Sequence, residues 1–174
     1  TPAIVAGWYE RAAADPARVV LADLGDPRAD EAAALLRDEG LAVVVEPVVD
    51  PGDVDCGPAI AAGLDPADPV VAATLLVRSG RADAAVAGAT RPTADVVRAG
   101  LRVLGMAPGV STVSSCFLMV LPDGRPITFG DCGVVPDPDV GQLTSIAVST
   151  ARTHAALTGE EPRVALLSFS TKGS

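Results

Sequence analysis

The feature that most constrains the fold is an alternation of strand-like and helix-like segments. A β-branched run at 18–23 is followed by a helix pattern that begins at Asp26 and Pro27 and stops at Gly40, and an apolar run at 41–49 comes next. An aspartate cap, a first-turn proline and a terminal glycine are the expected helix boundaries. The segment therefore predicts a βαβ unit with parallel strands and a right-handed crossover.

The same alternation continues along the rest of the chain, after a loop rich in Pro, Gly and Asp. The predicted elements are a helix at 70–80, a strand at 82–89, a helix at 92–106, a hairpin within 113–135 that turns at Pro122–Gly124, a helix at 139–157 and a strand at 163–169. This order predicts an α/β fold with a layered α/β/α arrangement. We expect a first lobe at 1–109 and the start of a second lobe at 110–174.

Composition and charge limit the type of core and the classes of binding partner that we expect. Hydrophobic residues make up 49% of the chain and aromatic residues only 3%, which favours a core of small aliphatic side chains between helices and a parallel sheet. The formal net charge of -9 repels polyanions, so we expect neither nucleic acid nor a membrane as a partner. A phosphate-bearing small molecule is still compatible with this charge where a few arginines converge.

The cysteines and the apolar segments predict a cytoplasmic protein without a metal. Cys56, Cys116 and Cys132 lack the paired spacing of zinc or redox motifs, which favours reduced thiols. No apolar run reaches the ~20 residues of a membrane span, and the N-terminal segment has the pattern of an amphipathic helix, not of a signal peptide.

A first candidate site lies where the strand at 82–89 runs into the next helix, "GATRPTADVVRAGL". Gly88, at the end of the strand, would let the backbone approach a ligand closely. Thr93 stands at the expected N-cap, and Asp95 shares a helix face with Arg98. With Arg91, these groups would lie at the carboxyl end of a strand, where open α/β sheets bind ligands. The alternative is a purely structural role, with Thr93 in a capping box and Asp95 in a surface pair with Arg98.

A second candidate is the polar segment that follows the strand predicted at 163–169. Ser170, Thr171, Lys172 and Gly173 could form a nest of amides and hydroxyls around an anion, with the lysine as a point charge. The glycine spacing of a Walker loop is absent. The alternative is a solvated polar terminus.

Five further residues carry polar side chains whose roles the sequence leaves open. Asp26 reads as a helix cap beside Asp23, and Arg28 could face solvent or a cleft. Asp131 could orient a cation or hydroxyl, or could stabilise a turn. His154 lies late in a helix, and no nucleophile is evident as its partner.

Several of these segments, in this order, resemble the phosphate acetyl/butyryltransferase family. The resemblance covers nearly the whole chain from Arg18 and is carried by "VVLADLGDPRADEAA", "DPADPVVAATLLVRSGRADAAVAGATRPTADVVRAGL", "GVSTVSSCFLMVLPDGRPITFGDCGVVPDPDVGQLTSIAVSTA" and "EPRVALLSFSTKGS". It implies an isocitrate dehydrogenase-like fold of two α/β lobes around a cleft, usually in a homodimer. It also implies reversible acetyl transfer between acetyl-CoA and phosphate, giving acetyl phosphate and coenzyme A, with coenzyme A as a substrate and no cofactor.

The resemblance also implies which residues line the cleft. They are Thr93, Asp95 and Arg98 on the coenzyme A side, and Ser170, Thr171, Lys172 and Gly173 at the border of the cleft, where they would neutralise phosphate charge. Arg91 departs from the family, which usually has histidine there, and is expected to help position coenzyme A. The base and the arginine that the family uses in catalysis are expected beyond Ser174, so the catalytic residues stay unknown and the chain as given is expected to be inactive. Two alternatives are an acetyl-CoA-sensing module without turnover and a transferase for butyryl groups.

Overall fold

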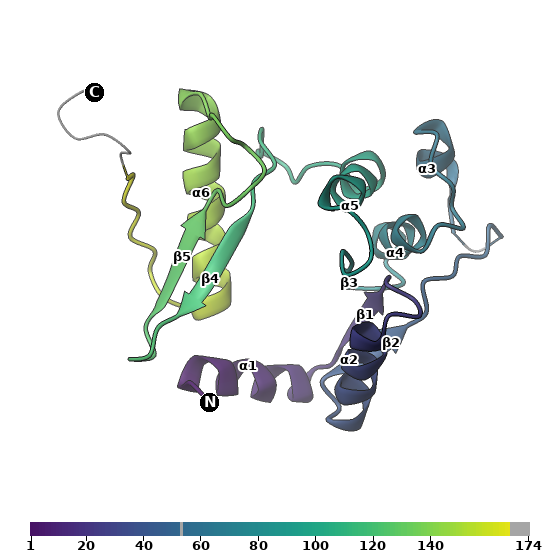
Figure 1. Ribbon diagram of the computed structural model, residues 1–174, viewed down its shortest axis with the longest axis horizontal. Coiled ribbons are helices and arrows are strands. Elements are labelled where there is room, and N and C mark those ends of the chain that lie inside the picture. Colours follow the sequence, from purple (N-terminus) through teal and green to yellow (C-terminus); the bar gives the residue numbers. More distant parts are fainter. Residues whose placement is uncertain (53, 168–174) are drawn as a thin grey trace. The chain divides into compact units, whose positions relative to one another are not determined.

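A computed structural model describes residues 1–52 and 54–167 (Figure 1). Contacts divide the chain into two compact units, one of Val5–Gly105 and one from Met106 onward together with Thr1–Ile4. The first helix, α1, covers Ala3–Ala14. Among the described residues, no helix is both long enough and apolar enough to cross a membrane.

The first unit contains a three-stranded parallel sheet. Its strands are β1 (Ala17–Leu21), β2 (Ala42–Val45) and β3 (Ala84–Val86), in the order β2-β1-β3. Both pairings are parallel, which confirms the predicted βαβ unit. Strands β2 and β3 are shorter than predicted, because Pro47 cannot donate to a ladder and Gly88 has a φ of +112°.

Helix α2 (Pro27–Asp38) joins β1 to β2 and ends where the sequence predicted. The Asp26 side chain accepts a hydrogen bond from the Arg28 amide at 2.9 Å and caps the helix. Gly40, with a φ of +65°, terminates it in the left-handed conformation that favours glycine.

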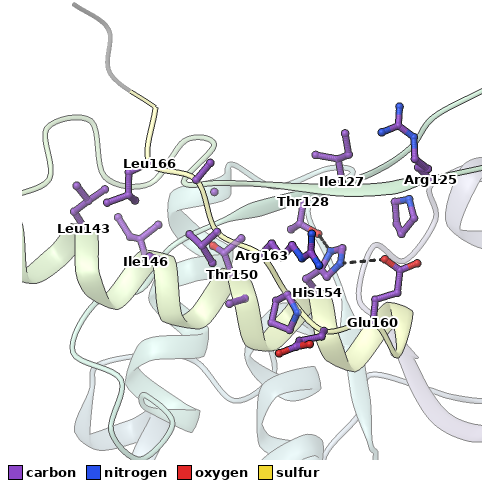
Figure 2. Close-up of a pocket in the computed structure, with 18 residues that line it drawn as sticks. Arg125, Ile127, Thr128, Leu143, Ile146, Thr150, His154, Glu160, Arg163 and Leu166 are labelled. Carbon is purple, nitrogen blue, oxygen red and sulfur yellow. Dashed lines mark hydrogen bonds and ion pairs between the residues drawn. The ribbon is translucent and has the colours of Figure 1, made fainter.

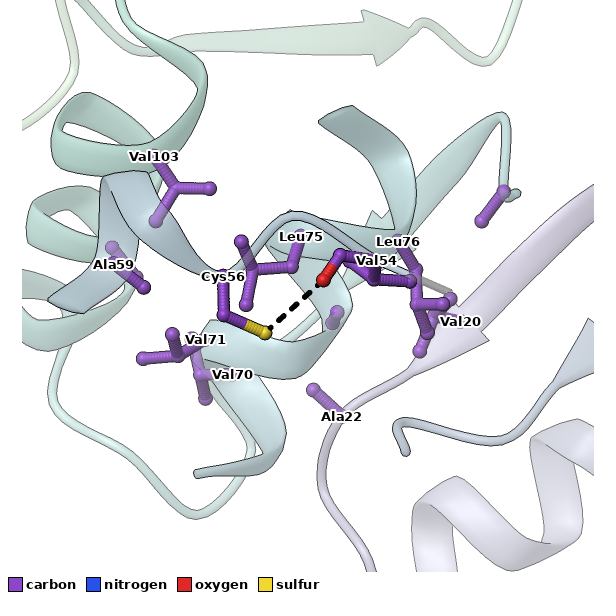
Figure 3. Close-up of a cluster of buried hydrophobic side chains, with 13 residues drawn as sticks. Val20, Ala22, Val54, Cys56, Ala59, Val70, Val71, Leu75, Leu76 and Val103 are labelled. Atoms are coloured by element: carbon purple, nitrogen blue, oxygen red, sulfur yellow. Dashed lines mark hydrogen bonds between the residues drawn. The ribbon is translucent and has the colours of Figure 1, made fainter. Parts of the chain in front are cut away.

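Helix α4 (Pro69–Arg78) lies at the centre of the core of the first unit (Figure 3). Every residue from Val70 to Leu76 is buried, as expected of a helix that is apolar on all sides. Short helix α3 (Gly57–Ala61) contributes Ala59 to the same core. The buried cluster comprises Val20, Ala22, Val54, Cys56, Ala59, Val70, Val71, Ala73, Leu75, Leu76, Ala82, Ala99 and Val103.

The helix predicted at 92–106 consists of two parts. Helix α5 (Thr93–Ala99) continues into a π-helical turn, η1 (Gly100–Leu104), in which the Gly105 amide donates to the Gly100 carbonyl at 3.1 Å. The prediction of Thr93 at the N-cap is wrong. Pro92 occupies the N-cap, with an extended ψ of 141°, and Thr93 is already the first helical residue and makes no side-chain cap.

The second unit holds the predicted hairpin and the long helix. Strands β4 (Cys116–Val120) and β5 (Pro126–Gly130) pair antiparallel, and the Leu121 amide closes the turn by donating to the Arg125 carbonyl at 2.9 Å. Helix α6 (Val140–Thr158) contacts β5 and starts with a capping box of Asp139 and Gln142.

The hairpin of the second unit leaves apolar side chains exposed. One face of the hairpin carries Phe117 and Met119 opposite Phe129 and Ile127, and all four are exposed.

The strand predicted at 163–169 is wrong over its described part, because residues 161–167 form no strand. Apolar alternation alone does not produce a strand there, since this segment pairs with no strand among the described residues.

Candidate functional site

The first candidate site, residues 88–101, which we call the helix-entry segment, lies at the carboxyl end of the parallel sheet. β3 ends at Val86, and the chain then turns through Gly88 into α5. Within this segment, Arg91, Thr93 and Arg98 are exposed. Their side chains can therefore be reached by a ligand from solvent.

Asp95 and Arg98 form an ion pair on one face of α5. Arg98 Nη1 lies 2.7 Å from Asp95 Oδ1, which confirms that the two share a face. Their side chains are 39% and 57% exposed, so the pair contributes no more than about 1 kcal/mol. A bound anion could replace the carboxylate at little cost.

Arg91 links the segment to helix α4. Its guanidinium contacts the carboxylate of Asp68, which also caps α4 by accepting a hydrogen bond from the Val70 amide at 2.9 Å. This partner of Arg91 was not predicted from the sequence. Its signal was the Asp-Pro pair at 68–69, which marks a helix start. Arg91 is thus held by a carboxylate that is itself fixed.

Asp23 is a buried carboxylate for which the sequence indicated no role beyond its place beside Asp26. It is 5% exposed and accepts hydrogen bonds from the Ala89 amide (3.1 Å), the Thr90 amide (2.9 Å) and the Thr90 hydroxyl (2.7 Å). Burial on its own would raise the pKa of Asp23, but these hydrogen bonds outweigh it and lower the pKa. The amides of Ala89 and Thr90 are hydrogen-bonded here, so they are not free to donate to a ligand.

Arg28 faces both solvent and the same turn. Its Nη2 donates to the Ala89 carbonyl at 2.8 Å and to Asp26 Oδ2 at 2.8 Å, while its side chain stays 70% exposed. Hydrogen bonding from Arg28 lowers the pKa of Asp26 to about 2. Asp26 therefore caps α2, as predicted, and also orients Arg28.

The remaining predicted positions divide into two groups. Ser170, Thr171, Lys172 and Gly173 lie outside the described residues. Asp131 stabilises the turn, because its carboxylate accepts hydrogen bonds from the Val134 (2.8 Å) and Val135 (2.7 Å) amides, and it also orients a hydroxyl, that of Ser115, at 2.7 Å. Burial alone would raise the pKa of Asp131, but these hydrogen bonds lower it strongly.

A separate pocket of about 490 Å³ lies within the second unit, between β5, α6 and residues 160–166 (Figure 2). His154 lies in it, with Nδ1 2.9 Å from the Thr128 hydroxyl and Nε2 3.9 Å from Glu160. The Thr150 hydroxyl is buried there, without a hydrogen-bond partner among the described residues. Thr128 was not predicted as a neighbour of His154, because the two residues are 26 positions apart in the sequence.

The described residues offer arginines for an anion but no ligand set for a metal. No group of three or more His, Cys, Asp or Glu side chains within residues 1–52 and 54–167 could hold a metal ion. Guanidinium groups bind phosphate in a bidentate manner, so Arg91 and Arg98 suit a phosphate-bearing ligand.

Comparison with known proteins gives a consistent result. Residues 59–174 match the family model described as phosphate acetyl/butaryl transferase. The chain is similar to the phosphate acetyltransferase of Paracoccus denitrificans, at 50% identity over 62% of this chain and 35% of that protein. The phosphate acetyltransferase of Treponema pallidum is 47% identical over 63% of this chain and 34% of its own length.

Solved structures of two phosphotransacetylases share the fold. The enzyme from Streptococcus pyogenes matches with a TM-score of 0.81 at 28% identity, over 98% of this chain and 63% of that one. The EutD phosphotransacetylase of Staphylococcus aureus matches with a TM-score of 0.77 at 26% identity, over 98% and 62%. The chain spans about a third of the length of the curated relatives it matches. The family model covers more than half of the chain, which therefore belongs to the phosphate acetyl/butyryltransferase family.

Proposed function

We propose that the full-length protein catalyses reversible acetyl transfer between acetyl-CoA and phosphate. The carrying observation is that the family match at 59–174 includes the helix-entry segment with its two exposed arginines. In this proposal, Arg91, Thr93 and Arg98 hold the phosphate groups of coenzyme A. Asp95 and Asp68 keep the arginines oriented until the ligand replaces them.

The reaction follows from the chemistry of an acyl phosphate. The thiolate sulfur of coenzyme A attacks the carbonyl carbon of acetyl phosphate and forms a C–S bond. The C–O bond to phosphate breaks, and phosphate leaves with the bonding pair. Ser170, Thr171, Lys172 and Gly173 are proposed to neutralise the phosphate charge, as the family resemblance implies. We assign no catalytic base among the described residues.

The proposal extends to location and assembly. A cytoplasmic protein would have access to acetyl-CoA and would keep its three cysteines reduced, which agrees with their free state in the structure. A homodimer is proposed from the family resemblance, and size-exclusion chromatography with light scattering would test it.

An assay of the full-length protein tests the reaction. Acetyl phosphate and coenzyme A should give a thioester, measured by its absorbance, with release of one phosphate per thioester formed. Binding of coenzyme A without turnover would instead indicate the acetyl-CoA sensor. A preference for butyryl phosphate would indicate the butyryl-transferring member.

A pair of variants tests the assigned site. Arg98→Ala should weaken coenzyme A binding about 10- to 100-fold, because it removes a hydrogen bond between charged groups worth about 1.5–3 kcal/mol. Arg102→Ala, on the exposed side of the following turn, should leave binding unchanged. Equal losses in both variants would show that overall positive charge, and not this site, governs binding.

A further inference from the structure

The backbone amide and carbonyl of Ala89 are both held by side chains, one from the loop after β1 and one from the first turn of α2. Asp23 Oδ2 accepts its amide at 3.1 Å, and Arg28 Nη2 donates to its carbonyl at 2.8 Å. The last backbone hydrogen bond between these neighbouring chain segments runs from the Ala22 amide to the Val86 carbonyl at 2.9 Å. The side chains therefore extend the connection beyond the sheet, into the turn that leads to α5.

Because Asp23 is buried, its carboxylate depends on the hydrogen bonds that it accepts from this turn. An ionised carboxylate out of water needs donors, and Asp23 takes all three that the structure gives it from Ala89 and Thr90. If the turn moved, the carboxylate would be left buried and unpaired. The turn is therefore fixed in one conformation, and Arg91 follows directly after it.

We propose that Asp23 is a positioning residue for ligand binding, which holds the turn so that Arg91 and the first residues of α5 are in place for the phosphate groups of coenzyme A. The inference rests on the proposed function. Asp23 does not contact the ligand itself, because its two oxygens are occupied by the turn. Its effect is expected in the affinity for coenzyme A, with the chemical step little changed.

The molecule contains a matched control at the opposite end of the same two strands. Asp83 precedes β3 and accepts hydrogen bonds from the Arg18 amide (2.8 Å), Nε (3.0 Å) and Nη2 (2.7 Å). It also joins the β1 region to the β3 region through three hydrogen bonds, but it lies at the amino end of both strands. A general loss of strand docking would follow from either substitution, whereas a positioning effect follows only from that of Asp23.

The experiment compares Asp23→Asn with Asp83→Asn in the full-length protein. Asparagine would present an NH2 group to an amide or hydroxyl of the turn and so break the network. For Asp23→Asn, we expect the Kd and KM for coenzyme A to rise about tenfold or more, with kcat changed less than about threefold. For Asp83→Asn, both constants should stay within about twofold of wild type.

A second pair of variants covers the case in which Asp23→Asn fails to fold. Thr90→Val removes the hydroxyl that donates to Asp23 and keeps the shape, whereas Thr90→Ser keeps the hydroxyl. Weaker coenzyme A binding in Thr90→Val and near wild-type binding in Thr90→Ser support the proposal.

Four outcomes would overturn the inference. Wild-type affinity in folded Asp23→Asn, or an equal loss in Asp83→Asn, rejects the positioning role and leaves the proposed function standing. For the second pair, the contrary result is equal affinity in Thr90→Val and Thr90→Ser. If the wild-type protein itself binds no coenzyme A, the proposed function fails and the inference fails with it.

Discussion

The two ends of the β1–β3 pair are joined by aspartates in different ways. At the amino end, Asp83 pairs with Arg18, and the two side chains are 48% and 43% exposed. At the carboxyl end, Asp23 is 5% exposed and binds only the turn that follows β3. The first arrangement joins two chain segments at the surface. The second fixes the conformation of a loop.

The difference shows where a buried charge is useful. An exposed ion pair tolerates small movements, because water can replace either partner. A buried carboxylate loses its solvation and depends on its donors, so it restricts the loop that supplies them. The restricted loop is the one that carries Arg91 into the candidate site.

The largest expected effect is on the core that supports both ends. Leu75, in α4, is completely buried, and Leu75→Ala should lower the free energy of unfolding by about 2–5 kcal/mol. Urea denaturation measures this change. A fall well below 2 kcal/mol would show that α4 does not support the sheet as described.

A smaller effect should appear at the carboxyl end when the helix cap is removed. Asp26→Ala deletes the cap of α2 and should cost about 0.5–2 kcal/mol in unfolding free energy. It also removes the ion pair that orients Arg28. Because Arg28 donates a hydrogen bond to the Ala89 carbonyl in the turn before Arg91, coenzyme A binding should weaken as well. Asp26→Ser can keep the cap without the ion pair. Weaker binding than wild type in both variants supports a role for Arg28 at the turn, and wild-type binding in Asp26→Ser would argue against it.

The smallest effect is the pH dependence of the stability that the Asp83–Arg18 pair contributes at the amino end of β1 and β3. Hydrogen bonding from Arg18 lowers the pKa of Asp83 from 3.8 to about 2. Because the folded-state pKa is the lower one, the stabilising contribution is full above the ordinary pKa and disappears as the pH falls towards 2. The stability difference between wild type and Asp83→Asn should therefore shrink over this range. A difference that stays constant down to pH 2 would contradict the assigned pair.

Local signals predicted most of the fold. The boundaries of α2 followed from Asp26, Pro27 and Gly40, which act within a few residues of the helix ends. The strand predicted at 163–169 failed over its described part, because a strand also needs a neighbour to pair with. Apolar alternation in a short segment says nothing about that neighbour.

The candidate site was predicted as a segment but not as a network. Arg91, Thr93, Asp95 and Arg98 were identified from a helix-entry pattern, and the Asp95–Arg98 pair followed from helical spacing. The contact of Asp23 with Thr90 joins residues 67 positions apart. It becomes visible only once β1 and β3 are known to be neighbours, and nothing in either local sequence indicates it.

Hydrogen–deuterium exchange with and without coenzyme A, on the full-length protein, tests the central claim most directly. Ligand should slow exchange in peptides that cover residues 88–98, at the carboxyl end of the β1–β3 pair. Peptides that cover Arg18 and Asp83, at the amino end, should be unaffected. Protection at the amino end without any change at 88–98 would contradict the account.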